Sequence, residues 1–158
     1  MIIILDLVQR KSVHSSTLYW YERITMANKI IVSTENWPVC VMNTFPTSMD
    51  ETRLWVEEMD LLLARREQFV LVYPPIAVQE KPSREDMEGM KYVRRWLKYA
   101  KEPMEQHCRA MVVTLQPDGS DKEEKERMAP MLSELYGPEV LLAVDVKTAK
   151  EQAELALI

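Results

Sequence analysis

Few residues of this chain have side chains that could carry out a reaction, and they are scattered along it. His107 and Cys108 are adjacent, and an imidazole close to a thiol can activate it as a nucleophile. Neighbouring residues of a helix do not face each other, so this adjacency does not by itself bring the two groups together. Cys40 and His14 could complete a site only by a chance approach in the fold. We expect Cys108 to be a small buried apolar residue, and we predict neither a catalytic residue nor a metal site.

Acidic side chains are abundant, but we expect them on the exposed faces of helices. A carboxylate that acts as a general acid or base usually has a pKa shifted by burial, and a solvated carboxylate lacks that property. The acidic groups are Asp50-Glu51, Glu57-Glu58-Asp60, Glu85-Asp86-Glu88 and Glu123-Glu124-Glu126. Asp145 differs because it interrupts an apolar segment near the place where open α/β sheets bind ligands. We interpret it as the cap of a helix that starts at Lys147, with a ligand-binding role as the alternative.

Two further features could make contacts. A stripe of basic side chains lies on one face of the helix expected after Ser83. Its members are Lys91, Arg94, Arg95, Lys98 and Lys101. The stripe could bind phosphate or an acidic protein, but a solvated helix face is the simpler interpretation, and nucleic acid is disfavoured on an acidic domain. Trp37, which precedes Pro38 in an expected turn, is the aromatic residue that we expect to be exposed, and aromatic residues are enriched in protein contacts.

The elements that position these residues follow from apolar patterning and turn signals. Two β-rich runs separated by a turn predict a hairpin, at 29–34 and 39–45. Continuous apolar runs predict strands covered on both faces, at 69–73, 110–115 and 140–146. Apolar residues at helical spacing predict helices at 48–66, from 83 to about 103, at 121–136 and at 147–158. Pro103 should end or kink the second helix.

The resulting order, β-β-α-β-α-β-α-β-α, predicts an α/β fold. Strands separated by single helices favour parallel pairing with right-handed crossovers. We therefore expect a mixed, mostly parallel sheet with an N-terminal hairpin and with helices packed on it.

The first 25 residues differ from the rest. Residues 1–8 are an apolar octamer broken by Asp6, and regular patterning begins only after Met26. We interpret residues 1–25 as an N-terminal extension or loosely attached arm, Met26 as the natural start, and residues 26–158 as a single domain. An added edge strand at 2–8 is the alternative. The octamer lacks a preceding positive charge, and no stretch is apolar enough to span a bilayer, so we expect a cytoplasmic protein.

Composition narrows the possible functions. The chain has 158 residues, a formal net charge of -5 and 28% charged residues, which fits one globular domain and disfavours a basic nucleic-acid-binding module. Two cysteines are too few for a disulfide framework or a four-thiolate zinc site. Three glycines argue against most glycine-rich phosphate loops. We therefore predict no cofactor.

The order of elements resembles the STAS domain, the family of the bacterial anti-sigma-factor antagonists, and especially its divergent stand-alone members. The resemblance spans residues 29–157 and rests on the opening hairpin, the helix leading into FVLVY, Trp96 and the closing TAKEQAELAL segment. Antagonists of this family carry a phosphorylatable Ser in an Asp-Ser-x-Gly-type turn after the strand that corresponds to FVLVY. Here that turn reads YPPIAVQEKPSREDMEG, and Ser83, ten residues beyond Tyr73, is better explained as a helix cap. The resemblance therefore implies a bacterial STAS-like fold without the phosphorylation switch.

These observations predict a non-catalytic domain that binds another protein. The specific version is an antitoxin or immunity protein that occludes a basic effector site, because residues 26–158 carry six more acidic than basic side chains and would be steered to a cationic cleft. The expected contact residues are Trp37, Asp50, Glu51, Glu57, Glu58 and Asp60. The alternative is a STAS-like regulatory or sensing module that binds a small molecule near Tyr73 and Asp145. We expect neither a nucleic-acid nor a membrane partner.

Overall fold

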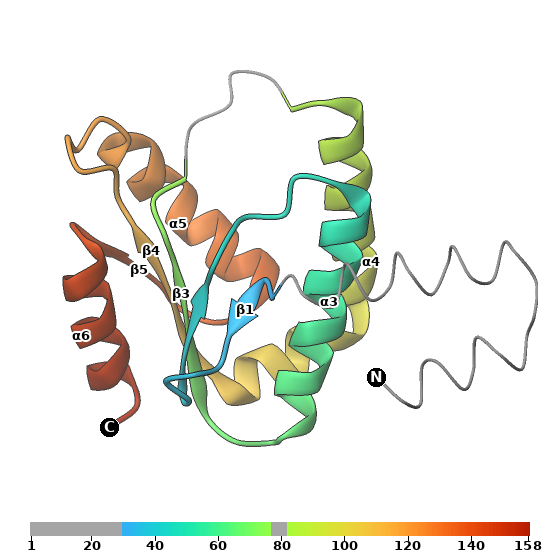
Figure 1. Cartoon of the computed structure of the whole chain (residues 1–158), viewed down its shortest axis with the longest axis horizontal. Coiled ribbons are helices and arrows are strands. Elements are labelled where there is room, and N and C mark those ends of the chain that lie inside the picture. The colour runs from blue at the N-terminus through green and yellow to red at the C-terminus, as the bar shows by residue number, and fades with distance from the viewer. Residues whose placement is uncertain (1–29, 77–81) are drawn as a thin grey trace, which may run out of the picture. The chain divides into compact units, whose positions relative to one another are not determined.

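Strands and helices alternate along the part of the chain that the structure describes. This structure is a computed structural model, and it describes residues 30–76 and 82–158. The elements in chain order are β1 (Val32–Ser33), β2 (Val39–Met42), α3 (Met49–Ala64), β3 (Phe69–Tyr73), α4 (Arg84–His107), β4 (Cys108–Thr114), α5 (Lys122–Tyr136), β5 (Val140–Ala143) and α6 (Val146–Ala156) (Figure 1).

The five strands form one sheet whose spatial order is the order of the chain, β1-β2-β3-β4-β5. β1 and β2 pair antiparallel, and the pairs β2–β3, β3–β4 and β4–β5 are parallel. The expected α/β fold with a mixed, mostly parallel sheet and an N-terminal hairpin is confirmed at this level.

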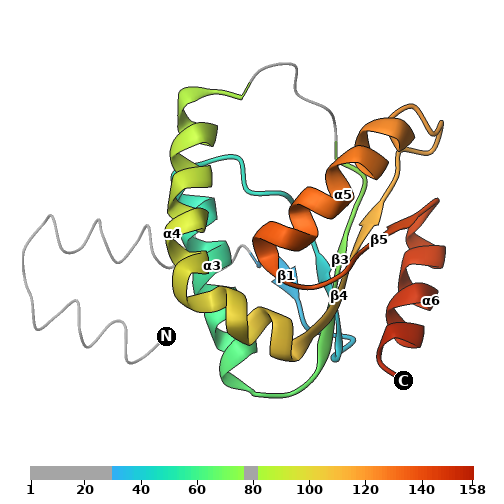
Figure 2. The ribbon, with the colours of Figure 1, turned by 180° about the vertical axis from the view of Figure 1, so that it is seen from behind.

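Helices cover the two faces of the sheet unequally. α3, α4 and α5 lie on one face, and α6 lies alone on the other (Figures 1 and 2). The reason is the strand order, because successive crossovers of one hand between sequential neighbours return to the same side of a sheet. α6 follows the last strand and is free of this constraint.

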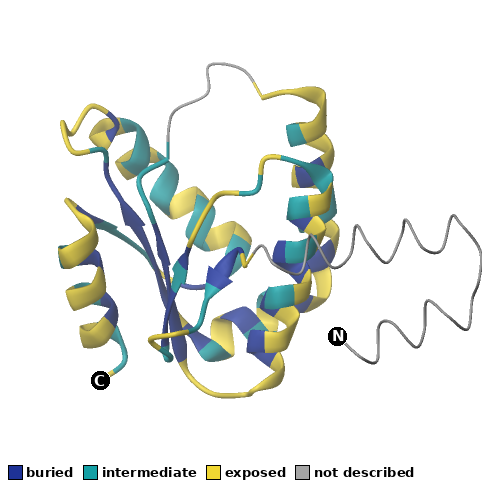
Figure 3. Ribbon diagram, viewed as in Figure 1, coloured by how far each residue is buried: buried dark blue, intermediate teal, exposed yellow. Residues whose placement is uncertain are grey.

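The core consists of two apolar layers, one on each side of the sheet. Every residue of β3 is buried, as expected for a strand that is covered on both faces. The layer under α3 and α4 contains large side chains such as Phe69, Met59 and Trp96. The layer under α6 contains small and β-branched ones, including Val70, Val112 and Ala153. In Figure 3 the buried residues follow the strands and the inner sides of the helices, while the outer sides of α3 and α4 are exposed.

Local signals in the sequence account for several helix boundaries. Ser48 caps α3 by accepting the Glu51 N–H at 3.1 Å. Ser83 and Asp86 form a reciprocal capping box at the start of α4, with N–H···O distances of 3.0 and 2.8 Å, which confirms the interpretation of Ser83 as a cap. The pKa of Asp86 is lowered, because hydrogen bonds from the backbone N–H and the side chain of Ser83 to its carboxylate favour the charged form.

We predicted that Pro103 either ends or kinks its helix, and the structure shows a kink. α4 continues past Pro103 to His107 and changes direction in its last third (Figure 2). Proline has no N–H to donate to the carbonyl four residues earlier, and its ring clashes with that carbonyl, so the helix bends. β4 begins at Cys108, directly after the helix, and the bend turns the end of α4 toward this strand.

Some expectations lie outside the described residues. They are the arm at 1–25, the alternative strand at 2–8, His14 and Met26. Residues 31–158 form one compact unit. Among the helices that the structure describes, none is both long and apolar enough to cross a membrane.

Candidate functional site

The pair formed by α3 and α4 carries a pocket lined by apolar and polar side chains. The two helices run side by side and in the same direction. Near their starts, Glu85 accepts the Met49 N–H at 2.8 Å, and a Cβ at Gly89 would lie only 3.2 Å from Oγ1 of Thr52. A residue with a side chain at position 89 would therefore require the Thr52 side chain to shift by a few tenths of an ångström.

Two tryptophans hold the middle of the pair together. The rings of Trp55 and Trp96 meet edge to face, with centroids 5.4 Å apart and an interplanar angle of 68°. Both residues are buried, and the Trp96 Nε1 donates to Oδ1 of Asp60 at 2.7 Å. One carboxylate that we expected at a partner interface thus also satisfies a buried indole.

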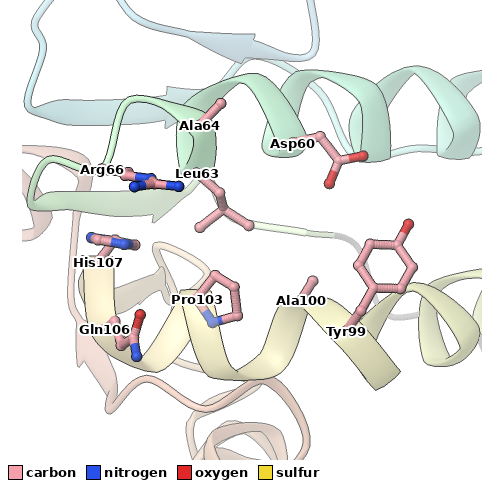
Figure 4. A pocket seen from close by; sticks show the side chains of 9 residues that line it. All are labelled: Asp60, Leu63, Ala64, Arg66, Tyr99, Ala100, Pro103, Gln106 and His107. Atoms are coloured by element: carbon pink, nitrogen blue, oxygen red, sulfur yellow. The ribbon is translucent and has the colours of Figure 1, made fainter.

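A pocket of about 530 Å³ opens where α3 and α4 end. Its lining residues are Asp60, Leu63, Ala64, Arg66, Tyr99, Ala100, Pro103, Gln106 and His107 (Figure 4). Leu63, Ala64, Ala100 and Pro103 supply its apolar part. The bend at Pro103 shapes one wall, because the residues on both sides of it line the pocket.

The pocket has different polar groups at its two ends. Asp60 and Tyr99 lie at one end, and Arg66, Gln106 and His107 lie at the other (Figure 4). The pKa of the Tyr99 phenol is raised, first by partial desolvation and then by the negative charge of Asp60. Nδ1 of His107 is buried and has no hydrogen-bond partner among the described residues. Such an atom could bond to water or to a polar group of a bound molecule.

Arg66 lies in an unusual backbone conformation. Its φ of 55° is the left-handed region, which glycine adopts most readily. It follows the C-cap Arg65, at the position where many helices place glycine to end. An arginine there costs backbone energy and adds a guanidinium to the pocket wall.

The cysteines do not form a nucleophilic site. Both are buried, as expected for Cys108. Burial raises the pKa of the Cys40 thiol to about 11 and that of Cys108 to about 12, so both remain protonated near neutral pH. The Cys108 thiol donates to the carbonyl of Ala110 at 3.3 Å. Among the described residues, no three His, Cys, Asp or Glu side chains are grouped closely enough to hold a metal ion.

Trp37 is only partly exposed and packs against the core. Its ring stacks on Phe69 with centroids 5.7 Å apart, and the Arg65 guanidinium lies 4.2 Å from its centroid on the α3 side. Its Nε1 donates to Glu67 at 3.2 Å. The expectation of an exposed aromatic residue is therefore corrected: the indole covers the edge of the core beside Phe69.

The expectation that Glu58 is an exposed contact residue is also wrong. Its carboxylate is half-buried and accepts the N–H groups of Ile31, at 3.1 and 3.2 Å, and of Val32, at 3.2 Å. Desolvation raises its pKa, and the same hydrogen bonds oppose the shift. Glu58 therefore anchors the start of β1 and is not the solvated charge that its position in an acidic run indicates.

The remaining predicted contact residues are spread around α3. Asp50 is exposed and lies 3.6 Å from Arg53. Glu51 is half-buried and accepts the N–H and hydroxyl of Thr47 at 3.2 and 3.3 Å. Glu57 is exposed. Of the six predicted residues, Asp60 is the one that lines the pocket.

The alternative site near Tyr73 and Asp145 is not brought together. Tyr73 is buried in the layer under α3 and α4, and desolvation raises its pKa well above the usual value. Asp145 is exposed and caps α6 on the other face of the sheet, by accepting the Thr148 N–H at 2.7 Å. The interpretation of Asp145 as a helix cap is confirmed, although α6 starts one residue before Lys147. Hydrogen bonds from the backbone N–H and the side chain of Thr148 lower the pKa of the Asp145 carboxyl.

Sequence reasoning missed the pocket and one buried carboxylate. The pocket depends on how two helices diverge, and no spacing in the sequence encodes that distance. Asp121 is 2% exposed; Oδ1 accepts the Gln116 N–H at 3.0 Å, and Oδ2 has no partner among the described residues. Asp121 directly precedes α5 and stands in a run of charged residues, a pattern that predicts an exposed side chain.

Comparisons of this chain with protein-family models, with curated proteins and with solved structures found no match. The resemblance to the STAS family therefore remains a prediction.

Proposed function

We propose that this domain acts by binding another protein through the outer surface of α3 and α4. The observation that carries the proposal is the pocket between these helices together with large exposed side chains on the same two helices. Tyr99 lines the pocket and is 66% exposed, and Leu61 is 70% exposed on α3. Anchor residues at protein interfaces are typically large side chains that fill such pockets, and arginine and tyrosine are enriched around them.

The narrower proposal is an antitoxin or immunity protein that occludes a basic effector site. The net charge of -5 supports it, because an acidic protein is steered toward a cationic cleft. Asp50, Glu57 and Asp60 are the exposed carboxylates of α3 that would face such a partner. Association should then slow steeply as the salt concentration rises, while dissociation changes much less.

A STAS-like regulatory module is the second candidate. The mixed sheet with one antiparallel pair followed by parallel strands supports it. A ligand site at the carboxyl edge of this sheet has less support. Such sites form where the order of parallel strands reverses, and β2 to β5 follow one another without reversal.

The proposal predicts that a larger effector protein is encoded beside this one, and the experiment measures binding between the two. Leu61→Asp should weaken a 1:1 complex by tenfold or more, since it places a charge at the proposed contact, an effect of about 1.4 kcal/mol or larger. Leu155→Asp is the matched control, because Leu155 is 69% exposed on α6, on the other face of the sheet. Equal effects of the two variants would contradict the proposed surface. A shift in melting temperature caused by a small molecule alone would favour the regulatory module.

A further inference from the structure

The basic stripe of α4 forms no ion pair with a carboxylate within the described chain. Four of its members, Lys91, Arg94, Arg95 and Lys98, are exposed, and Lys101 is half-buried. Within residues 30–76 and 82–158, no ion pair joins any of the five to a carboxylate; the ion pairs described there are Arg53–Asp50 and Lys122–Glu126. The guanidinium of Arg95 lies 6.0 Å from the Tyr92 ring centroid, a contact that leaves its charge in place.

These charges repel one another in the isolated protein. Like charges three or four residues apart on a helix face are neighbours and destabilise the helix. The stripe nevertheless sits on a chain with a net charge of -5. A local excess of cations on an acidic protein is a surface complementary to an anionic partner.

The pattern around the stripe limits the length of that partner. The eleven residues from 91 to 101 span about 15 Å of helix, since the ten steps between them rise 1.5 Å each. Exposed carboxylates lie on α4 at both ends of the stripe, at helical spacing from its lysines: Glu88 stands three residues before Lys91, and Glu102 and Glu105 stand four residues after Lys98 and Lys101. A duplex or a membrane surface continues beyond 15 Å and would meet these carboxylates, whereas a short acidic segment would not.

The neighbouring side chains match a protein contact. Met90 directly precedes the stripe and Met87 lies about one turn before it, each 51% exposed, and Tyr99 lies within its residue range. Methionine, tyrosine and arginine are enriched in the cores of protein interfaces.

We propose that the stripe binds a short acidic segment of a partner protein, laid along the middle of α4. This inference rests on the proposed function and deepens it, because it assigns a chemistry to one part of the partner. A carboxylate row at helical spacing of three and four residues would match the spacing of the cations.

The test uses the full chain and a fluorescent helical peptide of about 12 residues, in which glutamates recur every three or four positions. Fluorescence anisotropy should detect binding that weakens as salt rises from about 50 to about 300 mM. Arg94→Gln with Lys98→Gln should weaken this binding about tenfold. Lys147→Gln with Lys150→Gln makes the same change in net charge at exposed positions of α6, on the other face, and should leave it unchanged. The matching peptide with glutamine in place of glutamate should not bind.

Three results would overturn the inference: no binding of the acidic peptide, equal losses in the two double variants, or equally tight stripe-dependent binding to phosphatidylserine vesicles or duplex DNA. The last result would assign the stripe to an extended polyanion. Failure of this inference can be distinguished from failure of the proposed function. A native complex sensitive to Leu61→Asp but not to the Arg94 and Lys98 changes would remove only the inference. Peptide binding at the stripe, with a native complex insensitive to Leu61→Asp, would remove only the proposed α3–α4 pocket surface.

Discussion

Glu58 shows how a single carboxylate can belong to the framework although it lies in a run of surface charges. Its three hydrogen bonds to the N–H groups of Ile31 and Val32 tie α3 to the first strand. Ile31 and Val32 are buried, so their N–H groups would lack a partner without it.

We predict that Glu58→Lys lowers the free energy of unfolding by about 1–3 kcal/mol, the usual cost of leaving buried N–H groups unsatisfied. Glu57→Lys, at an exposed position, should change it by less than about 0.5 kcal/mol. Denaturant titration of both variants measures the difference. Equal midpoints would show that Glu58 does not anchor β1.

The two thiols offer a prediction with a defined pH window. Changing Cys40 and Cys108 to Ala should lower stability by about 1–3 kcal/mol through lost packing, and leave partner binding intact. In the folded chain the thiol pKa values are about 11 and about 12, against a usual 9.0. The folded state therefore retains the thiol protons more tightly than the unfolded state, and this contribution is complete below pH 9.0 and is lost as the pH rises toward 11 and 12. Stability measured between these limits should fall more steeply in the wild type than in the double variant; parallel curves would refute the assignment.

Replacing Arg66 should change the stability of the fold and the affinity for the partner in opposite directions. Arg66→Gly removes the cost of the left-handed conformation and should stabilise the fold by up to about 1 kcal/mol. The same change removes the guanidinium from the pocket and should weaken the complex with the partner. Thermal melting and a binding titration test the two effects separately. A variant that binds as tightly as the wild type would place the contact elsewhere.

At the scale of the elements, the sequence predicted the strands and helix caps that depend on local pattern. It did not predict contacts between segments that lie far apart in the chain. FVLVY reads as a doubly covered strand because every side chain is apolar, and Ser83 reads as a cap because Asp86 stands three residues later. Glu58 and Trp37 were misjudged because their burial is decided by segments 26 to 32 residues away in the chain, around Ile31, Val32 and Phe69. The pocket was missed for the same reason.

α6 depends on two small residues. Ala149 and Ala153 are fully buried and lie one turn apart on the side that faces the sheet. Ala153→Leu should overpack this contact and cost about 1–3 kcal/mol. Leu155→Ala on the exposed side should stay within about 0.5 kcal/mol. Thermal unfolding of the two variants provides the comparison, and a neutral Ala153→Leu would mean that α6 can move away from the sheet at little cost.

For the molecule as a whole, we predict that a chain starting at Met26 folds on its own. Residues 31–158 form one compact unit with both layers of the core. Thermal unfolding of the chain of residues 26–158 should remain cooperative, with a midpoint close to that of the full chain. Loss of the cooperative transition would assign residues 2–8 to the sheet, as in the alternative interpretation.

The order of the strands also describes how the molecule can be made. Each strand pairs with the one synthesised just before it, so the sheet can grow in step with the ribosome and no segment has to wait for a distant partner. Three helices close one side as they emerge, but the opposite side, with Val70 and Val112, stays uncovered until the 11 residues of α6 arrive. The interval between the emergence of β4 and that of α6 is thus the period in which this apolar face of the nascent domain is most prone to aggregate.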